Sequence, residues 1–104
     1  MADEEYAEAV LDLVATIPPG RAMTYGLIAE VLAERLGRGG PRVVGRVMAN
    51  SGGSVPWWRV TNAAGAPPPP YASDALAHLR DERTPLTADG TRVALRRAVW
   101  WPQD

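Results

Sequence analysis

Three segments in the first half of the chain place apolar residues at intervals of three and four, the spacing of amphipathic helices. The first covers residues 6–17 and stops at the Pro-Pro-Gly of residues 18–20. Thr24 is a suitable N-cap for a second helix over residues 25–36, and a proline suits the first turn of a third helix over residues 41–50. The short glycine-containing connection between these two predicts a helix-turn-helix pair.

The second half of the chain is rich in turn-forming residues. A turn is expected at residues 62–65, and the four consecutive prolines of residues 67–70 favour a stiff, extended connector. Residues 73–83 are expected to form a short helix with Ser73 as its cap, and residues 91–95 to form a strand. The expected fold is therefore mainly α, with a small β element.

A chain of 104 residues has the length of one domain, which we expect over residues 1–104. Its composition excludes several kinds of chemistry, because it has no cysteine, no glycine-rich phosphate loop and no His and carboxylate cluster at metal-ligand spacing. The one histidine, His78, has no evident partner, and a lone histidine is more often structural or exposed than catalytic. We expect no catalytic residue, no metal and no cofactor.

The N-terminal region is acidic and polar, without the basic start and apolar stretch of a signal peptide. No segment of the sequence is long enough to span a bilayer. We therefore expect a soluble, cytoplasmic protein without a membrane partner, and a monomer as the default state.

Charge is unevenly distributed along the chain, although the formal net charge is only -1. Residues 1–34 hold seven acidic residues and one arginine. Residues 35–60 hold no acidic residue and a basic cluster of five arginines, namely Arg35, Arg38, Arg42, Arg46 and Arg59. Such a cluster indicates contacts with a polyanion such as nucleic acid.

The predicted third helix carries Arg42, Gly45, Arg46 and Ala49 on the side opposite its apolar residues. Two guanidiniums there flank two residues with little or no side chain. Glycine inside a helix costs about 1 kcal/mol relative to alanine, so Gly45 is either tolerated or a place where the backbone of a partner comes close.

Two adjacent tryptophans, Trp57 and Trp58, stand between Pro56 and Arg59. Indole faces can stack on a displaced base, an interaction of roughly 1–3 kcal/mol. The alternative is that both indoles fill the core. Because adjacent side chains that follow a loop usually diverge, we expect one indole to pack inward and the other to line a cleft.

Three motifs occur in order along the chain: IPPGRAMTYGLIAEVL, PRVVGRVMAN and VPWWRV. Together they resemble the DNA-binding C-terminal domain of the O6-alkylguanine-DNA alkyltransferases, whose pattern is IPxG, TYGxIA, ARAVGxAxxxN and PCHRV. The resemblance runs from about residue 6 to residue 65 and is looser beyond. It implies a winged-helix-like helix-turn-helix fold whose DNA-binding helix enters the minor groove.

The resemblance places Trp57 where the family has its alkyl-accepting cysteine, and Trp58 where it has the activating histidine. An indole cannot accept an alkyl group by displacement as a thiolate does. The chain is thus similar to the alkyltransferase-like proteins, which bind O6-alkylguanine in double-stranded DNA by flipping the nucleotide and do not repair it. This similarity implies a non-enzymatic damage sensor that directs the lesion to nucleotide excision repair proteins.

The resemblance also assigns roles to individual residues. Arg42 matches the arginine that fills the gap left by the flipped nucleotide, and Tyr25 matches the tyrosine that helps rotate the phosphate. Asn50 lies one position from the family's hinge asparagine, and Arg59 keeps the arginine of PCHRV. The implied DNA-binding residues are Tyr25, Arg38, Arg42, Gly45, Arg46 and Ala49, and the implied lesion-pocket residues are Trp57, Trp58, Arg59, Asn50 and Tyr71.

Two departures limit what the resemblance implies. Relatives with tryptophan at the cysteine position commonly keep the following histidine, which Trp58 replaces here. Residues 66–71 stand in place of the family's binding loop, so adduct preference does not carry over. Other hypotheses are a sequence-specific helix-turn-helix regulator, an active enzyme, and a folded remnant with both tryptophans in its core.

Overall fold

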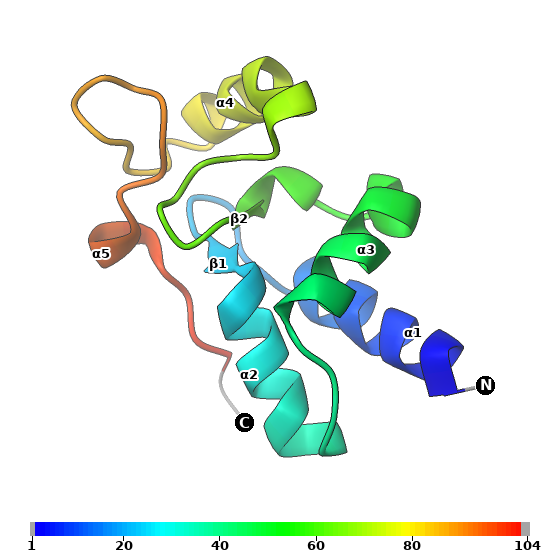
Figure 1. The fold of residues 1–104 in the computed structure, drawn as a ribbon. Coiled ribbons are helices and arrows are strands. Elements are labelled where there is room, and N and C mark those ends of the chain that lie inside the picture. The colour runs from blue at the N-terminus through cyan, green and yellow to red at the C-terminus, as the bar shows by residue number, and fades with distance from the viewer. Residues whose placement is uncertain (1, 103–104) are drawn as a thin grey trace.

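The computed structural model describes residues 2–102, which form a mainly helical fold with one small sheet (Figure 1). The α-helices and strands are α1 (Ala2–Ala15), β1 (Met23–Thr24), α2 (Tyr25–Leu36), α3 (Pro41–Ser51), β2 (Val60–Thr61), α4 (Ala72–Asp81) and α5 (Leu95–Ala98). Three short 3-10 helices are η1 (Gly52–Ser54), η2 (Trp57–Arg59) and η3 (Pro69–Tyr71). This architecture confirms the fold class expected from the sequence.

The first three helices pack against one another around the larger hydrophobic core (Figure 1). All three are present as predicted, although α1 ends at Ala15 and a turn covers Thr16 and Ile17. The buried side chains of this core are Tyr6, Val10, Leu13, Val14, Ile17, Met23, Leu27, Ile28, Ala29, Val31, Leu32, Val44 and Val60. Full burial of one such aliphatic side chain is worth roughly 1.5–3 kcal/mol, so this core is a main source of stability.

Both ends of α2 are formed by local sequence signals. The Thr24 hydroxyl accepts a hydrogen bond of 3.0 Å from the backbone N–H of Leu27, as expected of an N-cap. At the other end, Gly37 has a φ of 73°, and its N–H donates to the carbonyl of Ala33. A left-handed residue of this kind ends a helix at low cost when it is glycine.

A short parallel sheet ties the helical bundle to the segment that carries the two tryptophans. Met23 pairs with Val60, and Thr24 pairs with Thr61. Ala22, directly before β1, forms an isolated parallel bridge to Val99. The sheet therefore fixes η2, which directly precedes β2, relative to the start of α2.

The predicted strand over residues 91–95 is wrong. Val93 makes only an isolated antiparallel bridge with Leu86, and Leu95 begins α5. The N–H of Val93 instead donates to the carbonyl of Gly65 at 2.8 Å. The hydrogen-bond partner of Val93 is therefore a loop carbonyl and not a neighbouring strand, so residues 91–95 form no β-ladder.

The predicted helix over residues 73–83 exists as α4, but Ser73 lies inside it and is not its cap. The 3-10 turn η3 leads directly into α4, since the N–H of Ala72 donates to the carbonyl of Pro69. The extended connector predicted for residues 67–70 is therefore wrong for Pro69 and Pro70, which belong to η3.

The turn predicted at residues 62–65 is confirmed. The side-chain oxygen of Asn62 accepts hydrogen bonds of 2.9 Å from the N–H groups of Ala64 and Ala66. Gly65 has a φ of 86°, and a Cβ at this position would lie 2.3 Å from the carbonyl oxygen of Val93. Only glycine fits there, so the turn is held against the C-terminal segment. Within the part of the chain described, no helix has the length and apolar content needed to cross a membrane.

Candidate nucleic-acid interface

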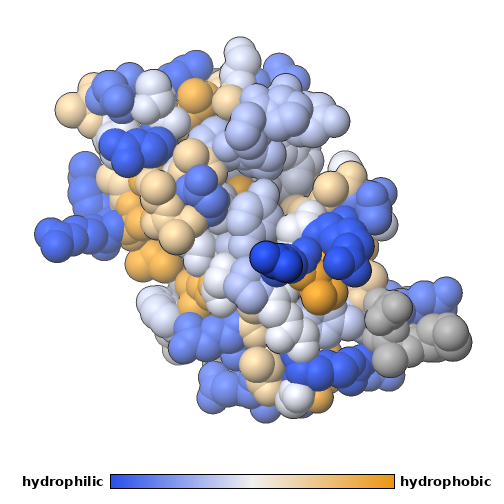
Figure 2. Space-filling view, viewed as in Figure 1, coloured by the Kyte–Doolittle hydropathy of each residue, from blue (hydrophilic) through white to orange (hydrophobic). Residues whose placement is uncertain are grey.

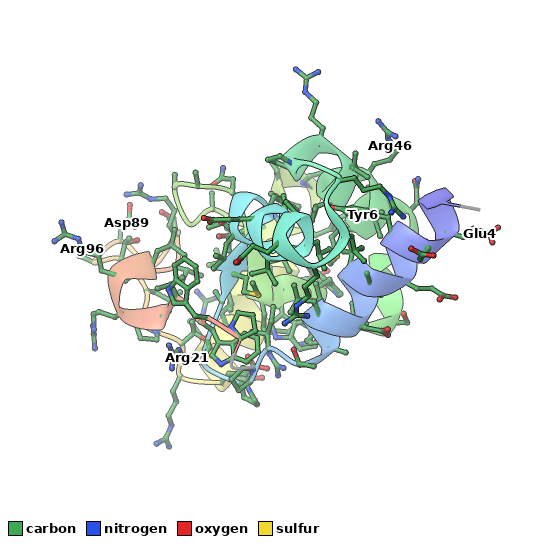
Figure 3. The ribbon with its side chains drawn as sticks, turned by 90° about the horizontal axis from the view of Figure 1, so that it is seen from below. Glu4, Tyr6, Arg21, Arg46, Asp89 and Arg96 are labelled. Atoms are coloured by element: carbon green, nitrogen blue, oxygen red, sulfur yellow. The ribbon has the colours of Figure 1, made fainter. Side chains whose placement is uncertain are left out.

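The helix α3 turns one face to the core and the other to solvent. Val44 is fully buried, and Val43, Val47 and Met48 pack against the same core. The helical period then directs Arg42, Arg46 and Ala49 outward, and all three are exposed. Figure 2 shows strongly hydrophilic side chains over α3, and in Figure 3 Arg46 points away from the body of the protein.

Gly45 makes no close contact that would require glycine, as far as residues 2–102 show. A Cβ built at this position meets no atom within 4 Å, and the backbone is ordinary helix. The cost of about 1 kcal/mol for glycine inside a helix is therefore not offset by any close contact that the structure describes. Gly45 lies on the same face of α3 as the exposed Arg42 and Arg46, so another molecule can approach the helix backbone closely there.

Two other predicted DNA-binding residues lie outside α3. Tyr25 is the first residue of α2 and is half-buried against the core, and this burial raises the pKa of its phenol. Arg38 lies in the loop between α2 and α3, where its guanidinium is 3.4 Å from the carboxylate of Glu5. Arg38 is thus held near α1.

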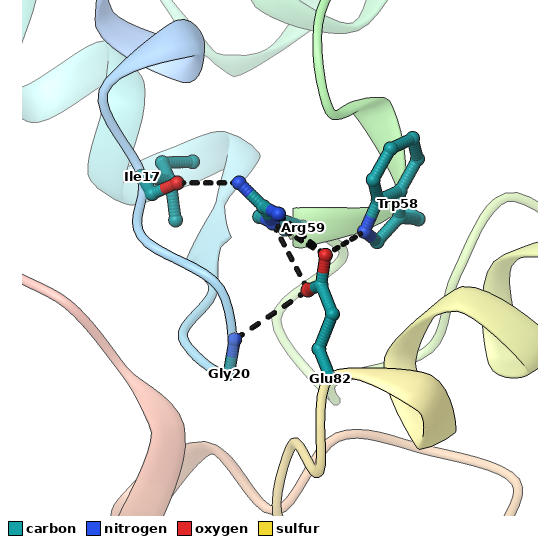
Figure 4. Close-up of polar contacts among 5 residues, drawn as sticks. All are labelled: Ile17, Gly20, Trp58, Arg59 and Glu82. Atoms are coloured by element: carbon teal, nitrogen blue, oxygen red, sulfur yellow. Dashed lines mark hydrogen bonds and ion pairs between the residues drawn. The ribbon is translucent and has the colours of Figure 1, made fainter.

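Arg59 does not belong to the exposed basic surface. Its side chain is only 12% exposed and pairs with Glu82, which is 14% exposed. Nε of Arg59 lies 3.0 and 3.2 Å from the two carboxylate oxygens, and Nη1 donates to the carbonyl of Ile17 at 2.7 Å (Figure 4). The guanidinium of Arg59 is bonded inside the fold, so Arg59 stands apart from the exposed arginines of the basic cluster.

Glu82 is a central site residue that the sequence analysis missed. Its carboxylate accepts hydrogen bonds from Arg59, from Nε1 of Trp58 at 3.0 Å and from the N–H of Gly20 at 3.4 Å (Figure 4). Burial by itself would raise the pKa of Glu82, but the bonds from Arg59 and Trp58 and the charge of Arg59 outweigh it and hold the pKa below its ordinary value. One carboxylate thus joins η2, the loop after α1 and the end of α4.

The two tryptophans take different positions, as expected. Trp58 packs against the smaller core of Ala22, Leu79, Val93 and Ala98, whereas Trp57 lines a hollow. Neither indole is fully buried, so the hypothesis that both fill the core is wrong.

Trp57 lies at the centre of an aromatic cluster. Its ring meets those of Trp58, Tyr71 and His78 edge-on, at centroid distances of 5.8, 5.9 and 6.1 Å. The rings of Trp58 and His78 stack in parallel at 3.9 Å. The expectation that His78 lacks a partner is therefore wrong, and its imidazole covers the indole that holds Glu82.

The hollow beside Trp57 has a volume of about 260 Å³ and is lined by Ala49, Gly53, Trp57 and Tyr71. It joins the outward face of α3, through Ala49, to the two predicted pocket residues Trp57 and Tyr71. Asn50 is not among its lining residues and instead borders a separate hollow, together with Arg46 and Val47. The predicted DNA-binding and pocket residues therefore meet at Ala49.

The chemistry of this hollow suits stacking and not covalent attack. Its walls are an indole, a phenol and two small residues, and the sequence contains no cysteine to act as a thiolate. The only indole N–H of Trp58 is already donated to Glu82. A flat ring inserted beside Trp57 would gain roughly 1–3 kcal/mol from stacking.

Comparisons with known proteins point to one family. A family model described as "6-O-methylguanine DNA methyltransferase, DNA binding domain" matches residues 5–90. The fold is similar to that of S. pombe ATL in complex with DNA, with a TM-score of 0.76 and 28% identity over 95% of this chain and 97% of that chain. It is likewise similar to S. pombe Atl1 in complex with damaged DNA containing O6-carboxymethylguanine, with a TM-score of 0.75, 28% identity and the same coverage. No curated protein sequence matches this chain.

Proposed function

Because this chain belongs to the family of the 6-O-methylguanine DNA methyltransferase DNA-binding domain, we propose that it binds O6-alkylguanine lesions in double-stranded DNA and transfers no alkyl group. The observation that carries the proposal is the continuity between two surfaces. Ala49 lies on the exposed face of α3 and also lines the aromatic hollow, together with Trp57 and Tyr71. The similarity to S. pombe Atl1 in complex with damaged DNA supports the same function.

In this proposal α3 lies in the minor groove of the duplex. The exposed guanidiniums of Arg42 and Arg46 meet the DNA, and Gly45 lets the helix approach closely. Arg42 fills the space that the damaged nucleotide leaves, and the phenol of Tyr25 helps to rotate the backbone phosphate. Flipping costs a few kcal/mol, and less at a weakened base pair, so part of the selectivity arises before the pocket is reached.

The flipped base then stacks beside Trp57, with Tyr71 at the rim of the hollow. Trp58 and Arg59 do not line the hollow. Both donate hydrogen bonds to Glu82 and so hold η2 in place. Neither tryptophan can serve as a nucleophile, and the base remains alkylated. The protein therefore acts as a monomeric, non-enzymatic sensor that needs no cofactor and leaves the lesion to nucleotide excision repair proteins.

The test is equilibrium binding to two duplexes that are identical except for one O6-methylguanine. The wild-type protein should prefer the damaged duplex, and Arg42→Ala and Tyr25→Ala should lose that preference. Equal affinity for both duplexes would overturn the proposal. Preference for one undamaged sequence in a selection from random duplexes would favour a helix-turn-helix regulator instead.

The absence of alkyl transfer needs a separate readout. The protein is incubated with a duplex that carries a radiolabelled O6-methyl group, and label is then counted on the protein. We expect all label to stay on the DNA, whereas stoichiometric label on the protein would establish an active enzyme.

A further inference from the structure

A second groove lies away from the aromatic hollow, between α1, α2 and the C-terminal segment of residues 99–102. It consists of two adjoining hollows of about 510 and 330 Å³, which share Arg35 and Pro102 as lining residues. The floor of the larger one is apolar and includes Leu32, Leu36 and Trp100. None of the residues that line this groove lines the hollow beside Trp57.

An exposed tryptophan stands at the edge of this groove. Trp101 is 57% exposed, and among the described residues only Tyr71 is a comparably exposed large apolar side chain. Tyr71 belongs to the aromatic hollow, whereas Trp101 has no part in the proposed DNA site. Exposed tryptophan beside an apolar recess is typical of the centres of protein interfaces.

The rim of the groove is acidic. Asp12, Glu30 and Glu34 line it and are exposed, and Arg35 is the one basic residue among the described residues that line it. This rim belongs to the acid-rich first third of the chain and differs in sign from the exposed face of α3. Its negative potential repels the DNA backbone and attracts a cationic partner.

The groove and the DNA-binding face use opposite sides of α1. Ala9, Asp12 and Thr16 face the groove, whereas Ala7 lies beside Val43 and Arg46 of α3. In Figure 3, Arg46 and Arg21 lie toward opposite edges of the molecule, and Arg21 is bonded to the carbonyls of Ala98 and Val99 at the start of the C-terminal segment. A partner in the groove therefore leaves α3 free.

We propose that this groove binds a basic segment of another protein that inserts a large apolar side chain beside Leu36 and Trp100. Lysine or arginine side chains of that segment pair with Glu30 and Glu34 and cover the face of Trp101, where a cation is attracted by the indole. This inference goes beyond the proposed lesion binding, since it concerns a different surface and a different class of partner.

The test begins with a random dodecapeptide library displayed on phage and selected on the immobilised full chain. Individual peptides are then measured by fluorescence anisotropy against wild type, Trp101→Ala and Glu34→Arg. The selected peptides should be enriched in Lys or Arg together with Trp, Leu or Phe. Both variants should weaken their binding by about tenfold or more, as for a residue at the centre of an interface.

Two controls separate the groove from unspecific charge attraction. Asp81→Arg makes the same change of charge as Glu34→Arg, but on α4, which contributes no residue to the groove, so it should leave peptide affinity unchanged. Affinity of Trp101→Ala for duplex DNA should also be unchanged, and peptide and duplex should bind together. Because peptide binding and DNA binding are measured separately, the groove can fail to bind peptide while lesion binding is retained, and lesion binding can fail while the groove still binds peptide.

Several outcomes would overturn the inference. Selected peptides could show no basic enrichment, or could bind Trp101→Ala and Glu34→Arg as tightly as wild type. Asp81→Arg could weaken binding as much as Glu34→Arg does. Sedimentation could also show a dimer that Trp101→Ala dissociates, in which case the groove is an interface between two copies of the chain.

Discussion

Nε1 of Trp58 donates a hydrogen bond of 3.0 Å to the carboxylate of Glu82, which also pairs with the guanidinium of Arg59. Two consecutive residues of η2 thus share one acceptor at the end of α4. By the resemblance of the motifs, Trp58 stands where the alkyltransferase pattern has its activating histidine. In this protein the side chain of Trp58 fixes η2 through its hydrogen bond to Glu82, and the fixed η2 in turn positions the neighbouring Trp57.

Removing the carboxylate should strongly destabilise the protein. In Glu82→Ala the guanidinium of Arg59 stays largely buried without its partner, and loss of one member of a fully buried ion pair costs about 3–5 kcal/mol, which is the upper bound for this pair. Urea unfolding followed by circular dichroism measures the change. Asp81→Ala, at the exposed neighbouring position, should change the free energy of unfolding by less than about 0.5 kcal/mol. Similar effects of the two substitutions would refute the role assigned to Glu82.

The same carboxylate should make stability depend on acidic pH. The pKa of Glu82 is lower in the folded protein than its unfolded value of about 4.3, so its stabilising contribution is complete above that value and is lost as pH falls through the folded pKa. Hydrogen bonds from Thr87 and Thr91 lower the pKa of Asp89 to about 2, which acts in the same direction.

The contribution of Glu82 is isolated by comparing wild type with Glu82→Gln from pH 6 to pH 3. Asp89 is present in both proteins, so its effect cancels in the difference. The gap in free energy of unfolding should be widest at pH 6 and should narrow toward pH 3. A gap that stays constant over this range would show that the charge of Glu82 does not stabilise the fold.

Gly45→Ala should separate stability from binding. The added methyl group meets no atom within 4 Å, so the change should stabilise α3 by up to about 1 kcal/mol. The same methyl group should weaken binding to duplex DNA, because it holds the helix away from the groove. Thermal unfolding and anisotropy measure the two effects, and a variant with unchanged DNA affinity would exclude close approach at this position.

The salt dependence of DNA binding should identify the arginines that meet phosphates. Each phosphate contact contributes a slope of about 0.9 to the fall of log affinity with log salt concentration. Arg46→Ala should lower this slope by about 0.9, the value for one phosphate contact. Arg96→Ala removes another exposed arginine, on α5 at the other edge of the molecule (Figure 3), and should leave the slope unchanged. If both variants lowered the slope equally, the exposed face of α3 would not be the surface that contacts the phosphates.

Elements with local causes were predictable from the sequence. The cap at Thr24, the glycine end of α2, the start of α3 at its proline and the turn at Asn62 each depend on neighbours a few residues away. The outward face of α3 was predictable from helical spacing, and the proximity of Trp57 to that face was predictable from the resemblance of the motifs.

Contacts between distant segments were not predictable in this way. Glu82 reaches Trp58 and Arg59 only because the chain closes a loop of about 24 residues, and no spacing rule marks such a pair. The failed strand at Val93 has the same origin, since its partner is a carbonyl of the loop at Gly65. Stacking of His78 on Trp58 likewise depends on where α4 packs.

The most direct test of the account is the lesion preference of Trp57→Ala. The ratio of dissociation constants for the plain and the O6-methylguanine duplex is measured for wild type and for this variant, with thermal unfolding to show that both are folded. If the flipped base stacks beside Trp57, the variant should lose about 1–3 kcal/mol of affinity for the damaged duplex and keep its affinity for the plain one, so that the ratio falls toward one. A folded variant with the wild-type ratio would contradict the account, because the lesion would then be recognised outside the aromatic hollow.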